Sequence, residues 1–289
     1  MEKNLSALEI YFIVKELKEK LAGGFVRKIY QYIDNSFLFE IYSPAKANAY
    51  WVYFDAGKIF ISEHKKQALE KPLLFCSVLR KHLEGRRIKR IVQHGFERIV
   101  ELDFGERRLV IELFSDGNVI LCDEEGIIIN ALHAREWRHR TVKPKLKYEY
   151  PPAKHNMIKM SFDEFMEYMK NGEKKSVVML SMLGFGAKYA KEICKIAKVS
   201  DQIQASELSM DELLALYKAI KEIMNKEIEA VLYEDDATPF PLLIYEDKKI
   251  VKRCETFSIA LDSLVFSDIE KEIKTSREEE KIRRVLERQ

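Results

Sequence analysis

The 289-residue sequence lacks the features that mark several common classes of protein. No apolar run approaches the roughly 20 residues that a membrane helix needs, so we expect no membrane partner. The N-terminus has no basic segment followed by an apolar one, as a secretory signal would, which favours a cytoplasmic location. The four cysteines are far apart and form no C-x-x-C pair, which argues against a zinc site and predicts reduced, mostly buried thiols.

Signatures of catalysis are also missing. The sequence contains no G-x-S-x-G, P-loop or H-E-x-x-H motif, and its six histidines are not spaced as metal ligands. Acidic residues are abundant, but no pair of them stands out as an acid and a base. We therefore predict a protein that is not an enzyme and needs neither a cofactor nor a metal.

An excess of one charge is absent as well. Lys and Arg number 49 and Asp and Glu 47, which gives a formal net charge of +2. Any argument for nucleic-acid binding must therefore rest on where the cations lie. The length exceeds what one core comfortably holds, so two or three modules are expected.

The patterns along the chain predict an α+β fold. Ser6 and Glu9 form an S-x-x-E capping box, which is typical of a helix start. The apolar positions that follow at helical spacing are Leu8, Phe12, Ile13, Leu17 and Leu21. A second helix is predicted over Lys71–Leu83. Short strands are predicted between residues 28 and 60 and between 88 and 131, so helices and strands together indicate an α+β sandwich.

The rest of the chain divides into further parts. Prolines and lysines gather around Val142–Pro152, which indicates a domain edge. We predict a first domain at 1–155, a helical module at 156–234, short strands that can pack back on the first domain at 235–267, and the start of a coiled coil at 268–289. The strands are predicted near Leu242–Tyr245, Lys249–Arg253 and Phe257–Ile259.

The sharpest local motif covers residues 179–193. Its order is apolar-x-x-apolar-x-Gly-apolar-Gly-x-x-x-Ala-x-x-apolar, with Gly184 and Gly186 as the glycines. This order matches the helix-hairpin-helix pattern, in which backbone N–H groups at a helix N-terminus seat a phosphate. Lys188, one turn into the second helix, would add charge attraction. The alternative is a plain αα-hairpin whose glycines serve only the turn.

A second candidate site combines a basic run with an acidic-basic pair. The run spans Arg80–Arg90, and its cations are Arg80, Lys81, Arg86, Arg87, Lys89 and Arg90, against a lone Glu84. Glu97 and Arg98 follow Gly95, which suggests a tight turn at the rim of a sheet. The acid can contact a ribose hydroxyl or a base edge while the arginine takes a phosphate. The alternative is a solvated helix end and a surface salt bridge.

A third candidate site lies between His133 and Lys147. It carries Arg135, Arg138 and Arg140, with Trp137 interleaved. An exposed ring among cations suits RNA, because the ring can stack on a base. The alternative places Trp137 in the core, with the cations on a linker.

Several stretches, in this order along the chain, resemble the NFACT family. That family includes the eukaryotic nuclear export mediator factor and ribosome quality-control subunit, and bacterial and archaeal relatives often called fibronectin-binding proteins. The most specific stretch is Phe75–Ile88. The others are the opening helix with Glu9, Gln93–Val100, Tyr150–Pro152, the hairpin at Gly184 and Gly186, Pro239–Leu242 and Phe257–Asp262.

The resemblance implies a fold and a function. The first domain should be similar to the N domain of formamidopyrimidine-DNA glycosylases, followed by a helix-hairpin-helix module and a coiled coil. The protein should bind tRNA and the large ribosomal subunit through its ribosomal RNA, and support C-terminal tailing of nascent chains. The family usually has aspartate where this chain has Glu97, and often where it has Glu9, so the geometry of tRNA contact can differ.

Two other functions are compatible with parts of this pattern. The first is a glycosylase-like enzyme acting on DNA, but those enzymes use an N-terminal proline, and this chain opens with Met1-Glu2-Lys3. The second is an adhesin-like module that binds fibronectin or another protein. The missing export signal argues against that as the main role.

Overall fold

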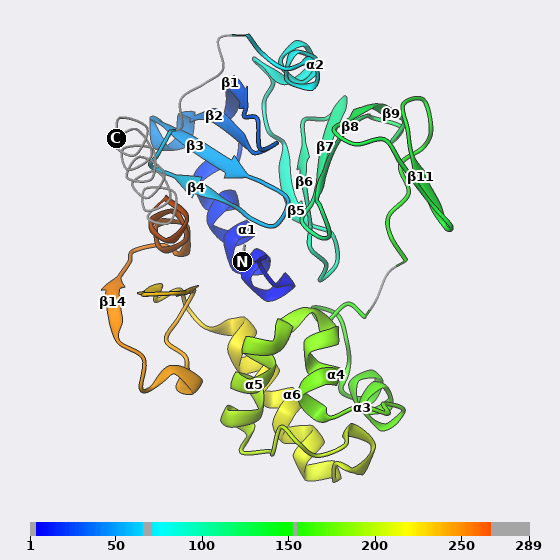
Figure 1. The fold of residues 1–289 in the computed structure, drawn as a ribbon, viewed down its shortest axis with the longest axis vertical. Coiled ribbons are helices and arrows are strands. Elements are labelled where there is room, and N and C mark those ends of the chain that lie inside the picture. The colour runs from blue at the N-terminus through cyan, green and yellow to red at the C-terminus, as the bar shows by residue number, and fades with distance from the viewer. Residues whose placement is uncertain (1–3, 66–70, 153–154, 267–289) are drawn as a thin grey trace, which may run out of the picture.

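The computed structural model describes residues 4–65, 71–152 and 155–266 of the chain. This part of the chain is an α+β protein with antiparallel sheets (Figure 1). Two sheets with a helix between them form the N-terminal part, and a group of helices lies below it. The predicted start of a coiled coil at 268–289 lies outside the described residues.

The first helix, α1 (Ala7–Leu21), is the centre of the N-terminal part. Its predicted capping box is confirmed: Glu9 N–H donates to Ser6 Oγ at 3.2 Å, and Ser6 N–H donates to the Glu9 carboxylate at 2.8 Å. All the apolar positions predicted for this helix are buried. Each such side chain contributes about 1.5–3 kcal/mol when it leaves water. Buried residues lie all round the helix, which explains why α1 is in the core.

The first sheet is an antiparallel meander in the order β1-β2-β3-β4. Its strands are β1 (Phe25–Gln31), β2 (Phe37–Ser43), β3 (Asn48–Phe54) and β4 (Ile59–Ser62). Phe37 lies opposite Phe54, and their rings stack with centroids 5.0 Å apart. Phe75 of the next helix, α2 (Leu74–Leu83), packs edge-on against Phe37 and closes this end of the core.

Helix α2 begins later than predicted. The predicted start at Lys71 is wrong, because Leu73 keeps an extended backbone with φ −64° and ψ 156° and Pro72 lies outside the helix. A proline disfavours helical backbone in the residue before it, which here is Lys71. The end of the helix at Leu83 is as predicted.

The second sheet has the order β5-β6-β7-β8-β9. Its strands are β5 (Arg90–Gln93), β6 (Ile99–Asp103), β7 (Arg107–Glu112), β8 (Asn118–Asp123) and β9 (Ile128–Ala131). Helix α1 contacts β2 and β4 of the first sheet and β5 of the second, so it lies between the sheets. A two-stranded hairpin, β10 (Arg135–Trp137) and β11 (Arg140–Val142), extends from the outer edge (Figure 1).

The helical module follows the second sheet. Its helices are α3 (Phe162–Lys170), α4 (Ser176–Leu180), α5 (Gly186–Ala197) and α6 (Met210–Asn225), and a π-helical turn (Ser181–Phe185) joins α4 to α5. The helices end earlier than predicted, because Lys226 has an extended backbone and a strand forms soon afterwards. One hydrophobic core runs through this module and the N-terminal part, and Phe240 contacts both Phe12 and Tyr189.

A small sheet in the order β13-β12-β14 follows α6. Its strands are β12 (Val231–Tyr233), β13 (Ala237–Thr238) and β14 (Ile250–Arg253). The strand predicted over Lys249–Arg253 is confirmed. The strand predicted near Leu242–Tyr245 is wrong, because this segment is a 3-10 turn. The buried Glu192 carboxylate accepts hydrogen bonds from the N–H groups of Leu243 and Ile244 at 2.9 and 3.0 Å, which favours the turn.

The third predicted strand, Phe257–Ile259, is also wrong, because residues 257–266 are helical. The buried carboxylate of Glu16 on α1 accepts hydrogen bonds from Phe257 N–H, from Ser258 N–H at 3.0 Å and from Ser258 Oγ at 2.6 Å. The first N–H groups of a helix have no partner within it. A carboxylate from the far end of the sequence therefore supplies the acceptors that this helix needs.

We expect Glu16→Ala to lower the free energy of unfolding by roughly 1–3 kcal/mol, because it leaves buried N–H groups without an acceptor. Glu19→Ala is the matched control: it lies on the same helix with its side chain 66% exposed, and its surface ion pairs should contribute less than about 1 kcal/mol. Denaturant titration followed by circular dichroism measures both. Equal losses in the two variants would contradict the role given to Glu16.

Candidate nucleic-acid interface

A cavity of about 260 Å³ lies where the N-terminal part meets the helical module. Three segments far apart in the sequence line it, together with His155: the start of α1, the turn before β6 and the turn before α5. Their lining residues are Asn4, Leu5, Ser6, Ala7, Phe96, Glu97, Arg98, Ser181, Met182, Leu183, Gly184 and Gly186. Two motifs that the sequence suggested separately, the Glu97-Arg98 pair and the glycine hairpin, therefore meet at one site.

The turn that carries Arg98 is fixed to α1 by one side chain. Gln93 Nε2 donates to the backbone oxygen of Ala7 at 2.8 Å and to that of Glu97 at 2.9 Å. Gly95 has a φ of +54°, a left-handed conformation that glycine adopts readily. The backbone oxygen of Arg98 accepts from Leu113 N–H at 2.8 Å. Hydrogen bonds to backbone atoms thus fix the position of Arg98, and they leave its side chain available to contact a ligand.

The guanidinium of Arg98 is the main unpartnered cation of the cavity. Burial lowers the pKa of Arg98, and the negative charge of Glu97 partly offsets this effect. Within the described part of the chain, the guanidinium makes no hydrogen bond or ion pair. A half-buried guanidinium without a partner favours an anion, since its fork of N–H donors matches a phosphate or carboxylate.

The glycine hairpin packs directly against the other two segments. Gly184 has a φ of +101°, and a Cβ placed there would stand 3.0 Å from both Ala7 Cβ and Phe96 Cδ1. Such distances are tighter than nine in ten real Cβ contacts, so a side chain here would push its neighbours away by a few tenths of an ångström. Gly186 also has a left-handed φ, +71°, and its N–H donates to Ser181 O.

Helix α5 begins at the cavity. No side chain caps its N-terminus, and Gly186 at its first position lines the cavity. The first N–H groups of a helix generally lack intrahelical acceptors, and the helix dipole places partial positive charge there. The cavity can therefore offer an anion both a guanidinium and a helix N-terminus.

Lys188 lies inside the joint, away from solvent. Its Nζ is 2.8 Å from Glu9 Oε1 and 3.1 Å from Asp236 Oδ2, and the three side chains are 19%, 7% and 6% exposed. Burial alone would lower the pKa of Lys188, but the charges of Glu9 and Asp236 outweigh it and raise that pKa. The hydroxyls of Tyr189 and Tyr245 donate to the same two carboxylates.

This network changes the interpretation of two predicted contacts. Glu9 and Lys188 are buried and paired with each other, so they position α1 against α5 and are not available for direct contact with a ligand. Asp236 completes the network. The sequence does not predict its role, because no local pattern marks it. Gln93 was also missed as a positioning residue, although it lies in a stretch that resembles the NFACT family.

The cations around α2 lie elsewhere. Helix α2 is at the far end of the N-terminal part from the helical module (Figure 1). Arg80 donates to Ile29 O at 2.8 Å, Arg86 pairs with Glu106 at 2.9 Å, and Arg87 donates to Gly23 O at 3.2 Å. Lys81 is exposed. These cations do not line the cavity, so they form a separate basic surface.

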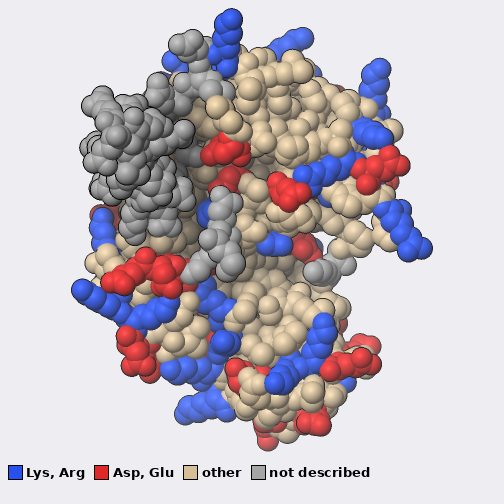
Figure 2. Space-filling model, in the orientation of Figure 1, with Lys and Arg blue, Asp and Glu red and all other residues tan. Residues whose placement is uncertain are grey.

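The β10–β11 hairpin holds the third set of predicted cations. Arg138 is exposed at its tip, and Arg135 pairs with Asp116 at 3.2 Å. Figure 2 shows Lys and Arg side chains at the edge of the molecule where this hairpin lies. Arg140 is a correction: its side chain is 7% exposed and pairs with the buried Glu112 at 2.6 Å, so it cannot reach a nucleic acid from this position.

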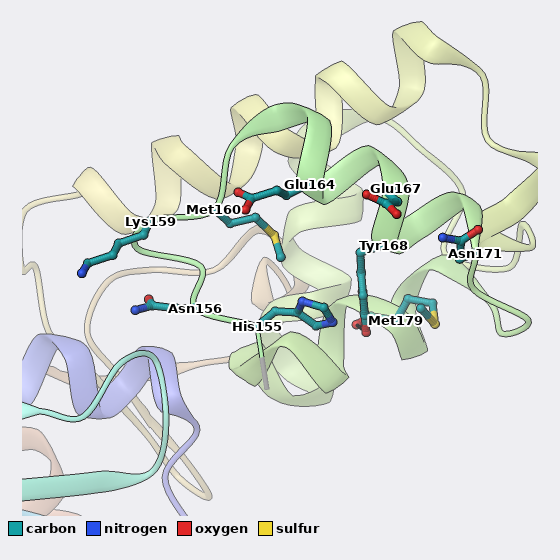
Figure 3. A pocket seen from close by; sticks show the side chains of 9 residues that line it. All are labelled: His155, Asn156, Lys159, Met160, Glu164, Glu167, Tyr168, Asn171 and Met179. Carbon is teal, nitrogen blue, oxygen red and sulfur yellow. Dashed lines mark hydrogen bonds between the residues drawn. The ribbon is translucent and has the colours of Figure 1, made fainter. Parts of the chain in front are cut away.

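A second cavity, of about 640 Å³, lies beside α3 and shares His155 with the first. Figure 3 shows the side chains of His155 and Tyr168 facing each other near Met179, and their ring centroids are 4.5 Å apart. The carboxylates of Glu164 and Glu167 line it. Negative charge here disfavours a phosphate, so we do not include this cavity in the interface.

The described residues contain no group of three or more His, Cys, Asp and Glu that could hold a metal ion. None of their helices is both long enough and apolar enough to span a bilayer. All four cysteines are free, and three of them are buried, as predicted.

The fold and the site define a two-part α+β protein with a cavity at its joint that Arg98 and the glycine hairpin line. Comparison with known families identifies it further: residues 6–289 match the family described as NFACT N-terminal and middle domains, and the chain belongs to that family. The resemblance inferred from the sequence is therefore confirmed.

Two curated relatives of this chain are Rqc2 homologues. It is 29% identical over 315 residues to the archaeal Rqc2 homolog aRqcH of Methanocaldococcus jannaschii, a match that covers 100% of this chain and 46% of the relative. It is 26% identical to the Rqc2 homolog RqcH of Bacillus subtilis, over 91% of this chain and 49% of the relative. The chain thus spans about half the length of these relatives.

Solved structures support the fold. The N-terminal part of the fibronectin/fibrinogen-binding protein of Streptococcus suis has a TM-score of 0.74 at 22% identity, covering 92% of this chain and 100% of that one. The fibrinogen binding protein of Staphylococcus aureus has a TM-score of 0.71 at 22% identity, covering 89% and 97%. The MutM (Fpg) protein of Thermus thermophilus reaches only 0.39, and we draw nothing from that likeness.

Replacement of Gly184 tests the close packing around the cavity. We expect Gly184→Ala to lower the free energy of unfolding by roughly 1–3 kcal/mol more than Gly85→Ala, because only the first introduces a steric clash. Gly85 is the matched control: its φ is +78°, but a Cβ there would meet nothing within 4 Å. Thermal or denaturant unfolding measures both. A loss in Gly184→Ala no larger than in the control would contradict the packing argument.

Proposed function

We propose that this chain binds tRNA at the cavity, as the N-terminal part of a ribosome quality-control factor that acts on the large ribosomal subunit. In this role it supports C-terminal tailing of nascent chains and performs no covalent chemistry itself. The observation that carries the proposal is the unpartnered, half-buried Arg98 beside the uncapped N-terminus of α5. The names of the relatives support the cellular role, since two are Rqc2 homologues and a third, of Saccharomyces cerevisiae, is the ribosome quality control complex subunit 2.

Each lining segment has a part in this proposal. Arg98 and the start of α5 take phosphates of the RNA backbone. The carboxylate of Glu97 accepts a hydrogen bond from a ribose 2′-hydroxyl or from an N–H group of a base, which favours RNA over DNA. Gly184 and Gly186 let the hairpin pack closely against Ala7, Phe96 and Ser6, and so bring the start of α5 to the cavity that Arg98 lines.

The remaining predicted residues act at other places. Glu9 and Lys188 position the segments of the cavity. Lys81 and Arg87, on the basic surface around α2, contact a different stretch of RNA, which we assign to the ribosomal RNA of the large subunit. Phosphate contacts of this kind carry no sequence information, so they set position and affinity.

Arg98→Ala tests the proposed site directly. We expect this variant to bind total tRNA at least about tenfold more weakly, because it loses charge-assisted hydrogen bonds to a phosphate. The slope of log Kd against log salt concentration should decrease by the amount that corresponds to the loss of about one phosphate contact. Fluorescence anisotropy with labelled tRNA, and with duplex DNA of similar length, measures both quantities.

Arg90→Ala is the matched control for charge. Arg90 lies in the same sheet, its side chain is 75% exposed, and it pairs with Asp103 at 2.7 Å. We expect nearly unchanged tRNA binding in this variant. The proposed site would be ruled out by equal effects of the two substitutions, and preference for RNA would be ruled out by equally tight binding of duplex DNA.

A further inference from the structure

The β10–β11 hairpin presents a large aromatic side chain to solvent. Trp137 is 41% exposed and lies at the end of β10, directly opposite Arg140 on β11. The two residues between them, Arg138 and His139, form the exposed tip. Figure 1 shows this hairpin extending from the edge of the second sheet, and none of its residues lines the cavity at the joint.

A buried ion pair holds the turn end of the hairpin in place. Arg140 Nη1 and Nη2 donate to the two carboxylate oxygens of Glu112 on β7, at 2.6 and 3.0 Å. Tyr148 Oη donates to the same carboxylate at 2.8 Å, and Arg140 Nη1 also donates to Glu149 O at 3.2 Å. Side chains so connected are hard to move, so the hairpin has a defined position on the sheet.

The same arginine orients the indole of Trp137. The guanidinium carbon of Arg140 is 4.5 Å from the centroid of the Trp137 ring, which is within the range of a cation–π contact. The ring is thus supported by a fixed cation while it remains largely exposed. A supported, exposed aromatic ring loses little conformational freedom when a flat ligand stacks on it.

The charge around the ring favours a polyanion. Residues 133–147 contain one acidic residue, Glu136, which pairs with Lys143 at 2.8 Å. Arg138, Lys145 and Lys147 are exposed. An apolar protein partner would need a wider apolar surface around Trp137, whereas a phosphate backbone needs cations at its edge.

We propose that the β10–β11 hairpin is a second RNA-binding element, in which Trp137 stacks on an unpaired base and Arg138 contacts an adjacent phosphate. The ligand is a loop or single-stranded stretch of RNA, because bases within a duplex are already stacked on each other. The inference rests on the proposed function, but it concerns a separate surface, so the two can fail independently.

Tryptophan fluorescence tests the stacking directly. The chain has two tryptophans, Trp51 and Trp137, so Trp51→Phe leaves Trp137 as the only one. We expect a single-stranded oligouridylate to quench the fluorescence of this variant on binding. A duplex RNA of the same length should quench it far less. Absence of quenching by the single strand, or equal quenching by both RNAs, would overturn the proposal.

Substitution of the ring gives a second measurement. We expect Trp137→Ala to weaken binding of the oligouridylate about tenfold or more, because stacking of a base on the ring is lost. Trp137→Phe keeps an aromatic face and should retain most of the binding. Unchanged circular dichroism and unfolding midpoints establish that both variants fold. Equal binding by Trp137→Ala and the wild type would overturn the proposal.

The Arg98→Ala substitution separates the two proposals. In the Trp51→Phe background, we expect it to leave quenching of Trp137 by the oligouridylate unchanged. Weaker tRNA binding in Arg98→Ala without any quenching of Trp137 would overturn the hairpin proposal and leave the cavity proposal standing. Quenching of Trp137 without any effect of Arg98→Ala on tRNA would support the hairpin and contradict the cavity.

Discussion

A single lysine between two buried carboxylates holds the joint of this protein together. Lys188 of α5 pairs with Glu9 of α1 and with Asp236 in the turn between β12 and β13, and all three side chains are largely buried. Loss of one partner from a buried ion pair typically costs about 3–5 kcal/mol, because it leaves a charge without compensation. Each member belongs to a different segment of the chain. The relative positions of those segments, and the shape of the cavity that two of them line, therefore depend on this network.

The cations that hold segments of this protein in place are distinct from those that can contact a ligand. Lys188 is neutralised inside the joint, whereas Arg98 remains unpartnered at the cavity. The hairpin repeats this arrangement, since Arg140 is paired with Glu112 while Arg138 is exposed. With a net charge of only +2, the molecule cannot attract RNA by its total charge. Under the proposed function, recognition of RNA therefore depends on a few hydrogen-bond donors held in fixed positions. The buried ion pairs fix those positions.

Features with local causes could be predicted from the sequence, and features with distant causes could not. The capping box of α1 and the turn between α4 and α5 depend on residues within a few positions of each other. The sequence predicts a strand at Phe257–Ile259, where the structure has a helix, because the carboxylate that caps this helix belongs to Glu16, 241 residues away. Asp236 has no local signal, since its partner in the network lies 48 residues earlier. The motifs that line the cavity could thus be predicted one by one from the sequence. That they meet at one site follows only from the three-dimensional fold.

Amide hydrogen exchange with and without tRNA tests the central claim most directly, since it reports on the backbone groups assigned to phosphate binding. The amide of Gly186 donates to Ser181 O, whereas the amides that follow it in α5 have no side-chain cap and should exchange quickly in the free protein. The account predicts that tRNA slows exchange at residues 94–98 and 181–188 together, because both segments line one cavity. Bound tRNA that leaves exchange in both segments unchanged, or slows it in only one, would contradict a shared binding site at the joint.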